Sequence, residues 1–183
     1  MMTEISLNIL DVAQNSITAG SLLTEIAIII DTATDTLEVI IDDNGSGMTS
    51  EQAANVINPF YTTRTTRKVG LGVPFLKMAA EFTGGDYQIK SAPGCGTNTT
   101  AVFGLTHIDR MPIGDIAGTM VSLIGSNPDL DFILRYSVDK KEFVMDTREM
   151  RQILEGVPLY EPEVLGFISG FINENIDSIG DRF

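Results

Sequence analysis

The segment Asp43-Asn44-Gly45-Ser46-Gly47 combines a carboxylate with two glycines. It comes shortly after Leu37–Ile41, a run of β-branched and apolar residues that is typical of a buried strand. A carboxylate at the end of such a strand can accept a hydrogen bond from an exocyclic amine such as that of adenine, and glycines let a flat ligand approach the backbone. The same residues also fit an ordinary turn. Motifs elsewhere in the chain are needed to distinguish between these two interpretations.

A second pair of polar residues, Asp11 and Asn15, is four positions apart within residues 3–19, which we predict to be a helix. Side chains four apart lie on one face of a helix. A carboxylate can accept a proton from an attacking hydroxyl, and carboxylate and amide oxygens can bind Mg²⁺. The pair therefore predicts a site for phosphate chemistry, although a solvated polar face would show the same spacing.

Cations gather in the segment Pro59–Lys68. The first 105 residues contain five Lys and Arg, and three of them, Arg64, Arg67 and Lys68, lie here among four threonines. In an acidic chain this composition indicates a local anion site or a loop that folds over one. A polar surface loop is the alternative.

A glycine-rich segment, Gly70-Leu71-Gly72-Val73-Pro74, follows directly and is predicted to open a helix that runs to about Phe82. Such an entry presents free N–H groups and the positive end of the helix dipole to a phosphate. The segment is not a P-loop, because G-x-x-x-x-G-K-[ST] does not occur in the sequence, and G-x-G-x-x-G is missing as well.

Composition limits the function classes. The chain has 183 residues with 25 Asp and Glu against 12 Lys and Arg, and the net charge of −13 argues against nucleic acid as a partner. A single cysteine, Cys95, and a single histidine, His107, exclude an intramolecular disulfide and a metal site made of several such residues. Neither a signal peptide nor an apolar run of membrane-spanning length is present, so we expect a cytoplasmic protein with no membrane partner.

In their order along the chain, these segments resemble the sequence boxes of the GHKL ATPase superfamily. This superfamily includes type II topoisomerases, heat-shock chaperones, histidine kinases and mismatch-repair ATPases. The segments that carry the resemblance are Leu10–Gly20 (N box), Asp43–Gly47 (D-x-G-x-G box), Asn58–Arg64 (F-box and lid of kinase members), Gly70–Val73 (second glycine box), and Gly94–Thr97 with Ala101–Phe103 (last box).

The resemblance implies ATP and Mg²⁺ as cofactors and suggests a role for each matching residue. Asn15 would hold Mg²⁺, Asp43 would accept the adenine amine, and Gly45 and Gly47 would let the ring lie close. Asp11 occupies the place of the glutamate general base of hydrolysing members. The other implied nucleotide-binding residues are Phe60, Thr62, Arg64, Lys68, Gly70, Leu71, Gly72, Val73 and Thr97.

The implied fold class is α+β, a two-layer α/β sandwich in which helices cover one face of a mixed, mainly antiparallel sheet. We predict an ATP-binding domain over residues 1–105. Residues 106–183 lie beyond the last box, and their pattern predicts a C-terminal α/β extension with a helix, a β-hairpin and two further helices. This extension either packs on the core or docks a partner.

For function, the resemblance suggests a bacterial signal-transduction protein: a cytoplasmic regulatory kinase that transfers phosphate to a partner protein, as anti-sigma serine kinases do. A complete histidine kinase is not expected, since no helical hairpin with a phosphoacceptor His precedes Asp11. Asp11 is also one methylene shorter than glutamate, and such misplacement can cost on the order of 100-fold in rate. A nucleotide-responsive switch with little turnover, or a slow ATPase, is therefore the alternative. The expected partners are ATP or ADP and a protein partner or substrate, with a second copy of the chain as a further option.

Overall fold

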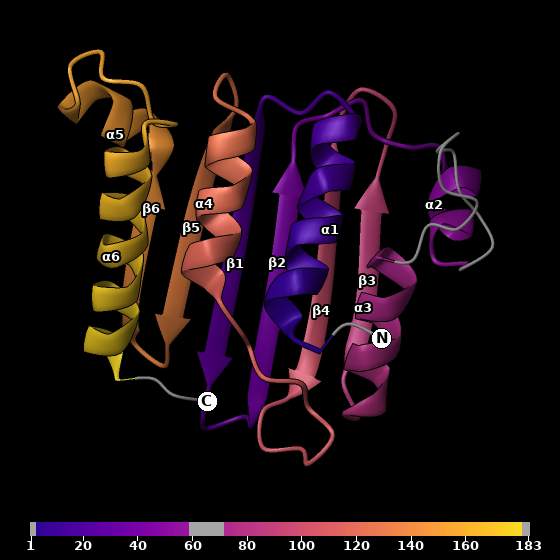
Figure 1. The fold of residues 1–183 in the computed structure, drawn as a ribbon. Coiled ribbons are helices and arrows are strands. Elements are labelled where there is room, and N and C mark those ends of the chain that lie inside the picture. Colours follow the sequence, from indigo (N-terminus) through magenta and orange to yellow (C-terminus); the bar gives the residue numbers. More distant parts are fainter. Residues whose placement is uncertain (1–2, 59–71, 181–183) are drawn as a thin grey trace.

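The computed structural model describes residues 3–58 and 72–180, which form helices on one face of a six-stranded sheet (Figure 1). In chain order the elements are α1 (Ile5–Thr18), β1 (Leu23–Asp31), β2 (Thr36–Asp43), α2 (Ser50–Val56), α3 (Gly72–Phe82), β3 (Asp86–Ser91), β4 (Thr97–Gly104), α4 (Ile116–Ser126), β5 (Asp131–Val138), β6 (Lys141–Asp146), α5 (Thr147–Ile153) and α6 (Pro162–Ile179). Within this part of the chain, no helix is long and apolar enough to cross a membrane.

The strand order in the sheet is β3-β4-β2-β1-β5-β6. β1 and β5 are parallel, and every other neighbouring pair is antiparallel. The predicted fold class is thus confirmed: the structure is an α+β two-layer sandwich with a mixed, mainly antiparallel sheet.

The core lies between the helices and one face of the sheet. Ile26 is opposite Ile41 and Ile28 is opposite Val39, and all four side chains are buried. Because successive strand residues point to opposite faces, these pairs form apolar rows under α1. At the end of β2 the rows become polar, where Asp43 takes the next position on the same face.

The C-terminal region continues the same sheet. β5 pairs with β1 along its whole length, from Leu23 opposite Asp131 to Ile30 opposite Val138. Figure 1 shows α4 beside α1 and α6 beyond it, on the face that the first helices cover. The described part of residues 106–183 therefore widens the sandwich, and the boundary at residue 105 stays a prediction.

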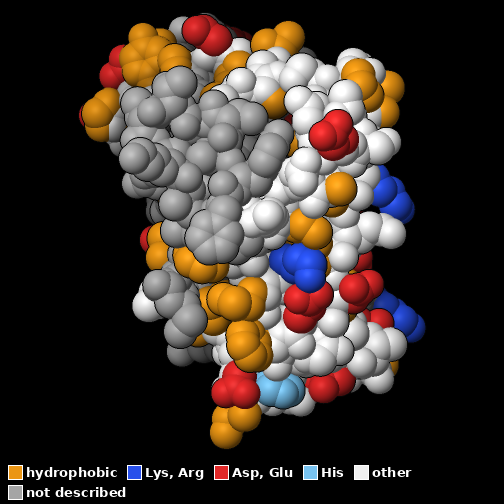
Figure 2. Space-filling model, turned by 90° about the vertical axis from the view of Figure 1, so that its right-hand side faces the viewer, with side chains coloured by type: hydrophobic (Ala, Val, Ile, Leu, Met, Phe, Trp, Pro, Cys, Tyr) orange, Lys and Arg blue, Asp and Glu red, His pale blue; other side chains and the backbone are white. Residues whose placement is uncertain are grey.

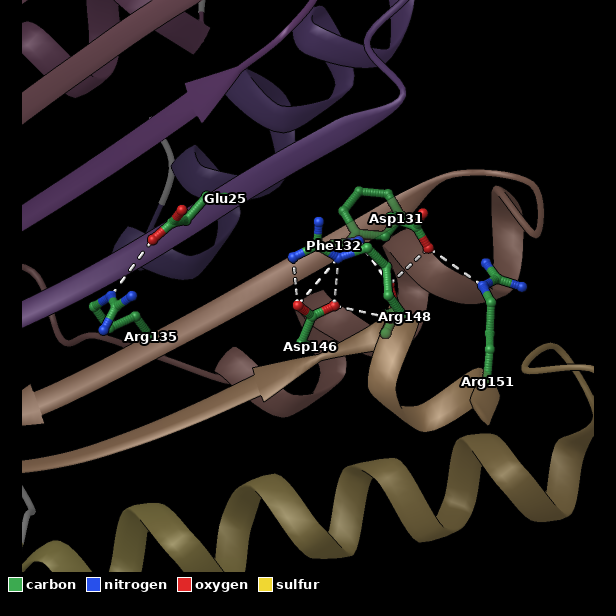
Figure 3. Close-up of polar contacts among 8 residues, drawn as sticks. Glu25, Asp131, Phe132, Arg135, Asp146, Arg148 and Arg151 are labelled. Atoms are coloured by element: carbon green, nitrogen blue, oxygen red, sulfur yellow. Dashed lines mark hydrogen bonds and ion pairs between the residues drawn. The ribbon is translucent and has the colours of Figure 1, made fainter. Parts of the chain in front are cut away.

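The corner between β5 and α5 is fixed by a buried hydroxyl. Thr147 is fully buried, and its Oγ1 accepts a hydrogen bond from the Phe132 N–H at 2.9 Å and donates to Asp131 Oδ1 at 3.1 Å. Arg151 Nε donates to the same Asp131 oxygen at 3.2 Å (Figure 3). The start of α5 is thereby tied to the start of β5.

Asp146 caps α5, and this generates a prediction about pH. Its carboxylate accepts from the Arg148 backbone N–H and pairs with the Arg148 guanidinium at 2.6 Å, and the side-chain hydrogen bond from Arg148 holds the pKa of Asp146 below its usual value (Figure 3). A carboxyl whose folded pKa is lowered stabilises the fold above its unfolded pKa and loses that contribution as the pH falls through the folded value. Asp146→Asn keeps a capping side chain but removes the charge. We expect wild type to be more stable than Asp146→Asn at pH 7, with a difference that shrinks below about pH 4. Urea unfolding across this range measures it, and a difference that does not vary with pH would contradict the charge pairing.

Candidate functional site

Asp43 is a buried carboxylate at the end of β2, with a relative exposure of 8%. The Ser16 hydroxyl of α1 donates to its Oδ2 at 2.7 Å, and the Gly45 N–H donates to its Oδ1 at 2.9 Å. Each carboxylate oxygen has a further lone pair, so the group can still accept a hydrogen bond from a ligand. The predicted acceptor therefore has the chemistry that an exocyclic amine requires.

Thr97 begins β4 directly opposite Asp43. Its hydroxyl lies 3.0 Å from the Ser91 hydroxyl, which also donates to the Gly96 carbonyl and accepts from the Met48 N–H. Among the described residues, the hydroxyl that hydrogen-bonds to Asp43 is that of Ser16 and not that of Thr97. The sequence prediction did not include Ser16 or Ser91; the signal for Ser16 was a polar residue within the apolar stripe of α1.

Asn44 fixes the chain on the other side of Asp43. Its Oδ1 accepts from the N–H groups of Leu22 and Leu23 at 2.9 and 3.0 Å and from the Ser21 hydroxyl at 3.1 Å. The start of β1 is thus joined to the end of β2, which holds Asp43 between two fixed segments.

The glycines of this segment are explained by contacts within the chain. A Cβ on Gly47, whose φ is +65°, would lie 1.9 Å from the Ala92 carbonyl oxygen, and one on Gly96, with φ +79°, would lie 1.8 Å from the Asp43 carbonyl oxygen. At Gly45 the nearest atoms, in Ala19 and Asp43, would be 3.0 Å away. The turn before β4 and the end of β2 therefore pass in backbone contact. The implied roles of Gly45 and Gly47 beside an adenine ring remain predictions.

Asp11 lies against the first residue of α3. A Cβ on Gly72 would be 2.1 Å from Asp11 Oδ2, so the Asp11 carboxylate lies directly against Gly72 and would have to move to admit a side chain there. Val73, the next residue of α3, is buried. The structure thus brings Asp11 to a helix N-terminus, where unpaired N–H groups and the helix dipole favour negative charge. Asn15 is one turn further along the same face of α1 and is half-buried.

Asn8 is a buried polar residue that the sequence prediction did not include. It is fully buried, and its Nδ2 donates to the Glu4 carbonyl at 3.1 Å, whereas its Oδ1 has no hydrogen-bond partner in the described structure. Asn8 precedes Asp11 by three residues and Asn15 by seven, so the three side chains share a face of α1. This spacing from Asp11 and Asn15 was the sequence feature that could have indicated Asn8 as a candidate site residue.

Tyr87 lies on the same sheet face as Thr97, opposite Ala101 of β4. Burial raises the pKa of Tyr87 to about 12, and the hydroxyl of Thr99 opposes this by a smaller amount. The phenol therefore stays neutral at physiological pH, and it lies in the row of Val39 and Ala101, four residues along the strands from Asp43.

The remaining predicted site residues, Phe60, Thr62, Arg64, Lys68, Gly70 and Leu71, lie outside the described residues. In the described ranges, no three Asp, Glu, His or Cys side chains come together as a metal site. Asn15, the predicted ligand of Mg²⁺, is half-buried on the face of α1 that also carries Asp11, and its role as a ligand stays a prediction.

The described site residues form two anchor points on α1. Ser16 contacts Asp43, and Asp11 contacts the start of α3. Five residues of helix separate them, about 7.5 Å along the axis. Near Ser16, the Asp43 carboxylate offers a hydrogen-bond acceptor for an amine. Near Asp11, the start of α3 offers a helix N-terminus for an anion. A nucleotide such as ATP carries an amine at its base and an anion at its phosphates.

Comparison with known proteins identifies a family for more than half of the chain. Residues 2–107 match the family described as histidine kinase-, DNA gyrase B-, and HSP90-like ATPase. Among solved structures, the chain resembles one described as the N-terminal domain of a DNA repair protein, with a TM-score of 0.51 and 14% sequence identity. The similarity covers 79% of this chain and 53% of that one, so this chain corresponds to about half of that structure. At this identity the likeness concerns the fold alone.

The glycine contacts give a testable prediction about stability. Gly47 and Gly94 both have positive φ, but a Cβ on Gly94 would meet nothing within 4 Å. Gly94→Ala should therefore cost only the left-handed backbone penalty of about 1–2 kcal/mol. Gly47→Ala should cost a further 1–3 kcal/mol or so, because the clash with the Ala92 carbonyl forces the backbone to move. Urea unfolding of both variants measures the difference, and equal losses would show that the close approach is absent in solution.

Proposed function

The chain belongs to the family of histidine kinase-, DNA gyrase B- and HSP90-like ATPases, the GHKL ATPases, and we propose that it is a cytoplasmic regulatory kinase that transfers the γ-phosphoryl group of Mg-ATP to a partner protein. Family membership establishes an ATP-binding domain of GHKL type. The kinase activity rests on one observation, the position of the Asp11 carboxylate against Gly72 at the start of α3.

At the base end, Asp43 accepts the hydrogen bond of the adenine amine. Ser16 and Gly45 hold its two oxygens in place, so the carboxylate is oriented before the ligand arrives. Preorganisation of this kind supports affinity because little ordering remains to be done on binding.

At the phosphate end, the N–H groups at the start of α3 would bind the phosphates, and Asn15 would hold Mg²⁺. When bound, Mg-ATP supplies the phosphoryl group and part of its charge neutralisation. Asp11 lies beside this helix end and accepts the proton of the attacking hydroxyl. In phosphoryl transfer the protein contributes mainly positioning and electrostatic stabilisation, which these residues provide.

The second candidate function is a nucleotide-responsive switch with slow or no hydrolysis. The observation that favours it is the short side chain of Asp11, whose carboxylate already contacts Gly72. A hydroxyl or water placed for a glutamate would lie beyond its reach. In both cases the partner is a protein, since the net charge of −13 argues against nucleic acid.

Nucleotide binding is tested by thermal unfolding with Mg-ATP. At about 100 times Kd, ATP should add roughly 2.7 kcal/mol to the free energy of unfolding. Asp43→Asn should lose most of this gain, because the amide presents a donor where the adenine amine needs an acceptor. Asp42→Asn is the matched control, since Asp42 is the preceding residue of β2 and is exposed. Equal gains in both variants would contradict the role of Asp43, and no gain in wild type would contradict the nucleotide site.

Phosphate transfer is tested with labelled ATP and cell extract. Asp11→Ala should reduce labelling of a partner protein about 100-fold or more, the usual contribution of a general base, and should leave the Mg-ATP stability gain in place. Asp109→Ala, a change of an exposed aspartate outside the site, serves as the control. Labelling that Asp11→Ala does not alter would refute this base. If wild type shows neither labelling nor phosphate release, the nucleotide-responsive switch is the remaining candidate function. That function requires ATP and ADP to change the amount of partner protein recovered with the chain.

A further inference from the structure

The two ends of the sandwich differ in how their charges are arranged. Figure 2 views the molecule from the β3 end, and acidic and basic side chains lie close together there. The opposite end is formed by the loop after α5 and by α6 (Figure 1), and residues 152–180, which make up this region, contain no Lys or Arg. The acidic residues of the same stretch are Glu155, Glu161, Glu163, Glu174 and Asp177.

Cations on the neighbouring elements are already engaged within the chain. α6 contacts α4, β5 and β6, and α4 contains no Lys or Arg. Arg135 of β5 pairs with two glutamates, and Lys141 of β6 donates from Nζ to the Ile179 carbonyl at 3.3 Å. The two arginines of α5 pair with aspartates. Among the described residues, no ion pair includes Glu163 or Glu174.

Two aromatic side chains lie on the outer side of α6. The Phe171 ring contacts the ring of Phe143 on β6 edge-on, with 5.4 Å between the centroids, and Phe167 stacks on Phe171 at 6.0 Å. The contact with β6 accounts for Phe171. Phe167 reaches beyond it and is 62% exposed, so a large apolar ring at this end of the sandwich faces water.

The unpaired acids bracket this aromatic pair. Glu163 precedes Phe167 by four residues, and Glu174 follows Phe171 by three, so all four side chains lie along one face of the helix. Both glutamates are exposed. Eleven residues of helix separate them, which corresponds to about 16 Å along the axis. The face thus has an apolar centre and a negative charge at each end.

Two glycines border the same face. Gly166 and Gly170 are four residues apart in the interior of α6, and a Cβ on either would meet nothing within 4 Å. Glycine in a helix interior is less favourable than alanine, and no contact within the chain requires it here. The bare backbone beside the aromatic pair allows another helix to approach α6 closely.

We propose that this surface binds an amphipathic helix of a partner protein, one that carries Lys or Arg beyond both ends of its apolar stripe. We call the surface the α6 face; its residues are Glu163, Gly166, Phe167, Gly170, Phe171 and Glu174. The apolar stripe of the partner covers the two rings, and its cations pair with the two glutamates. The inference does not depend on the proposed kinase activity.

Charge decides between this occupant and the others. α6 carries acidic residues and no basic ones, so a second copy of the chain would bring like charges together at the α6 face. Nucleic acid and anionic membrane surfaces are repelled for the same reason. A helix that lays apolar side chains against Phe167 and cations against the glutamates meets both features of the surface.

A synthetic helical peptide serves as the probe. It has the length of α6, 18 residues, with leucines along one face, lysines beyond both ends of the leucine stripe, and a fluorescein label. Fluorescence anisotropy with the full chain, at physiological ionic strength so that non-specific attraction is screened, should give a Kd between about 1 and 100 µM. A peptide of the same composition, shuffled so that its leucines no longer share a face, should bind about tenfold more weakly. A peptide with glutamates in place of the lysines should not bind in this range.

Variants of the chain locate the binding surface. Phe167→Gln should raise the Kd of the amphipathic peptide about tenfold. Glu163→Gln should raise it about threefold, whereas Glu51→Gln, the same change of charge at an exposed position of α2, should leave it unchanged. Gly170→Gln should weaken binding by covering the bare backbone, and yet raise the melting temperature, because glutamine is the better helix former.

Circular dichroism melting of each variant confirms that it is folded. Absence of binding up to about 100 µM overturns the proposal, as does a shuffled peptide that binds as tightly as the amphipathic one. Equal Kd values for wild type and Phe167→Gln overturn it too, because the peptide would then bind elsewhere on the acidic surface. Sedimentation equilibrium of the chain alone tests the competing occupant, and a dimer that Phe167→Gln dissociates would assign the α6 face to a second copy instead.

Discussion

The buried carboxylate of Asp43 is the constraint on which the rest of the site depends. A carboxylate removed from water must recover its hydrogen bonds within the protein, and here Ser16 and Gly45 provide one to each oxygen. To do so, α1 has to lie across the end of β2 and the chain has to turn immediately after Asp43. The same placement of α1 brings Asp11 to the start of α3. Satisfying the hydrogen bonds of one buried carboxylate therefore also sets the distance between Asp43 and Asp11, the two ends of the proposed nucleotide site.

Sequence patterns predicted helices and strands well because these depend on local signals, and the fold class followed from the family resemblance. The β-branched run Leu37–Ile41 marked the strand β2, and the helical pattern of residues 3–19 marked the helix α1. Side-chain partners were not predictable in the same way. The bond from Ser16 to Asp43 spans 27 positions. Nothing in the local sequence of Asn8 shows that its oxygen is buried without a partner.

The glycines show a further limit of motif-based interpretation. The motif predicted that Gly47 lets an adenine ring lie close, which stays a prediction; in the structure, a Cβ at Gly47 would meet the Ala92 carbonyl of the same protein. Gly72 is different, because it makes room for the carboxylate of Asp11. The glycines of these motifs thus include some that lie against backbone and one that lies against a side chain, and atomic contacts are needed to distinguish them.

The parallel pairing of β1 with β5 has a consequence for how the protein folds. About 100 residues separate these two strands, and long-range parallel pairing forms slowly because the loop entropy is lost before the contacts are gained. During synthesis β1 emerges early and pairs with β2, but its other edge has no strand partner until β5 has been synthesised. Ile26 and Ile28 of β1 therefore belong to an incomplete sheet in the nascent chain. The N-terminal segment that carries the family motifs gains its last strand partner only when translation has passed residue 138.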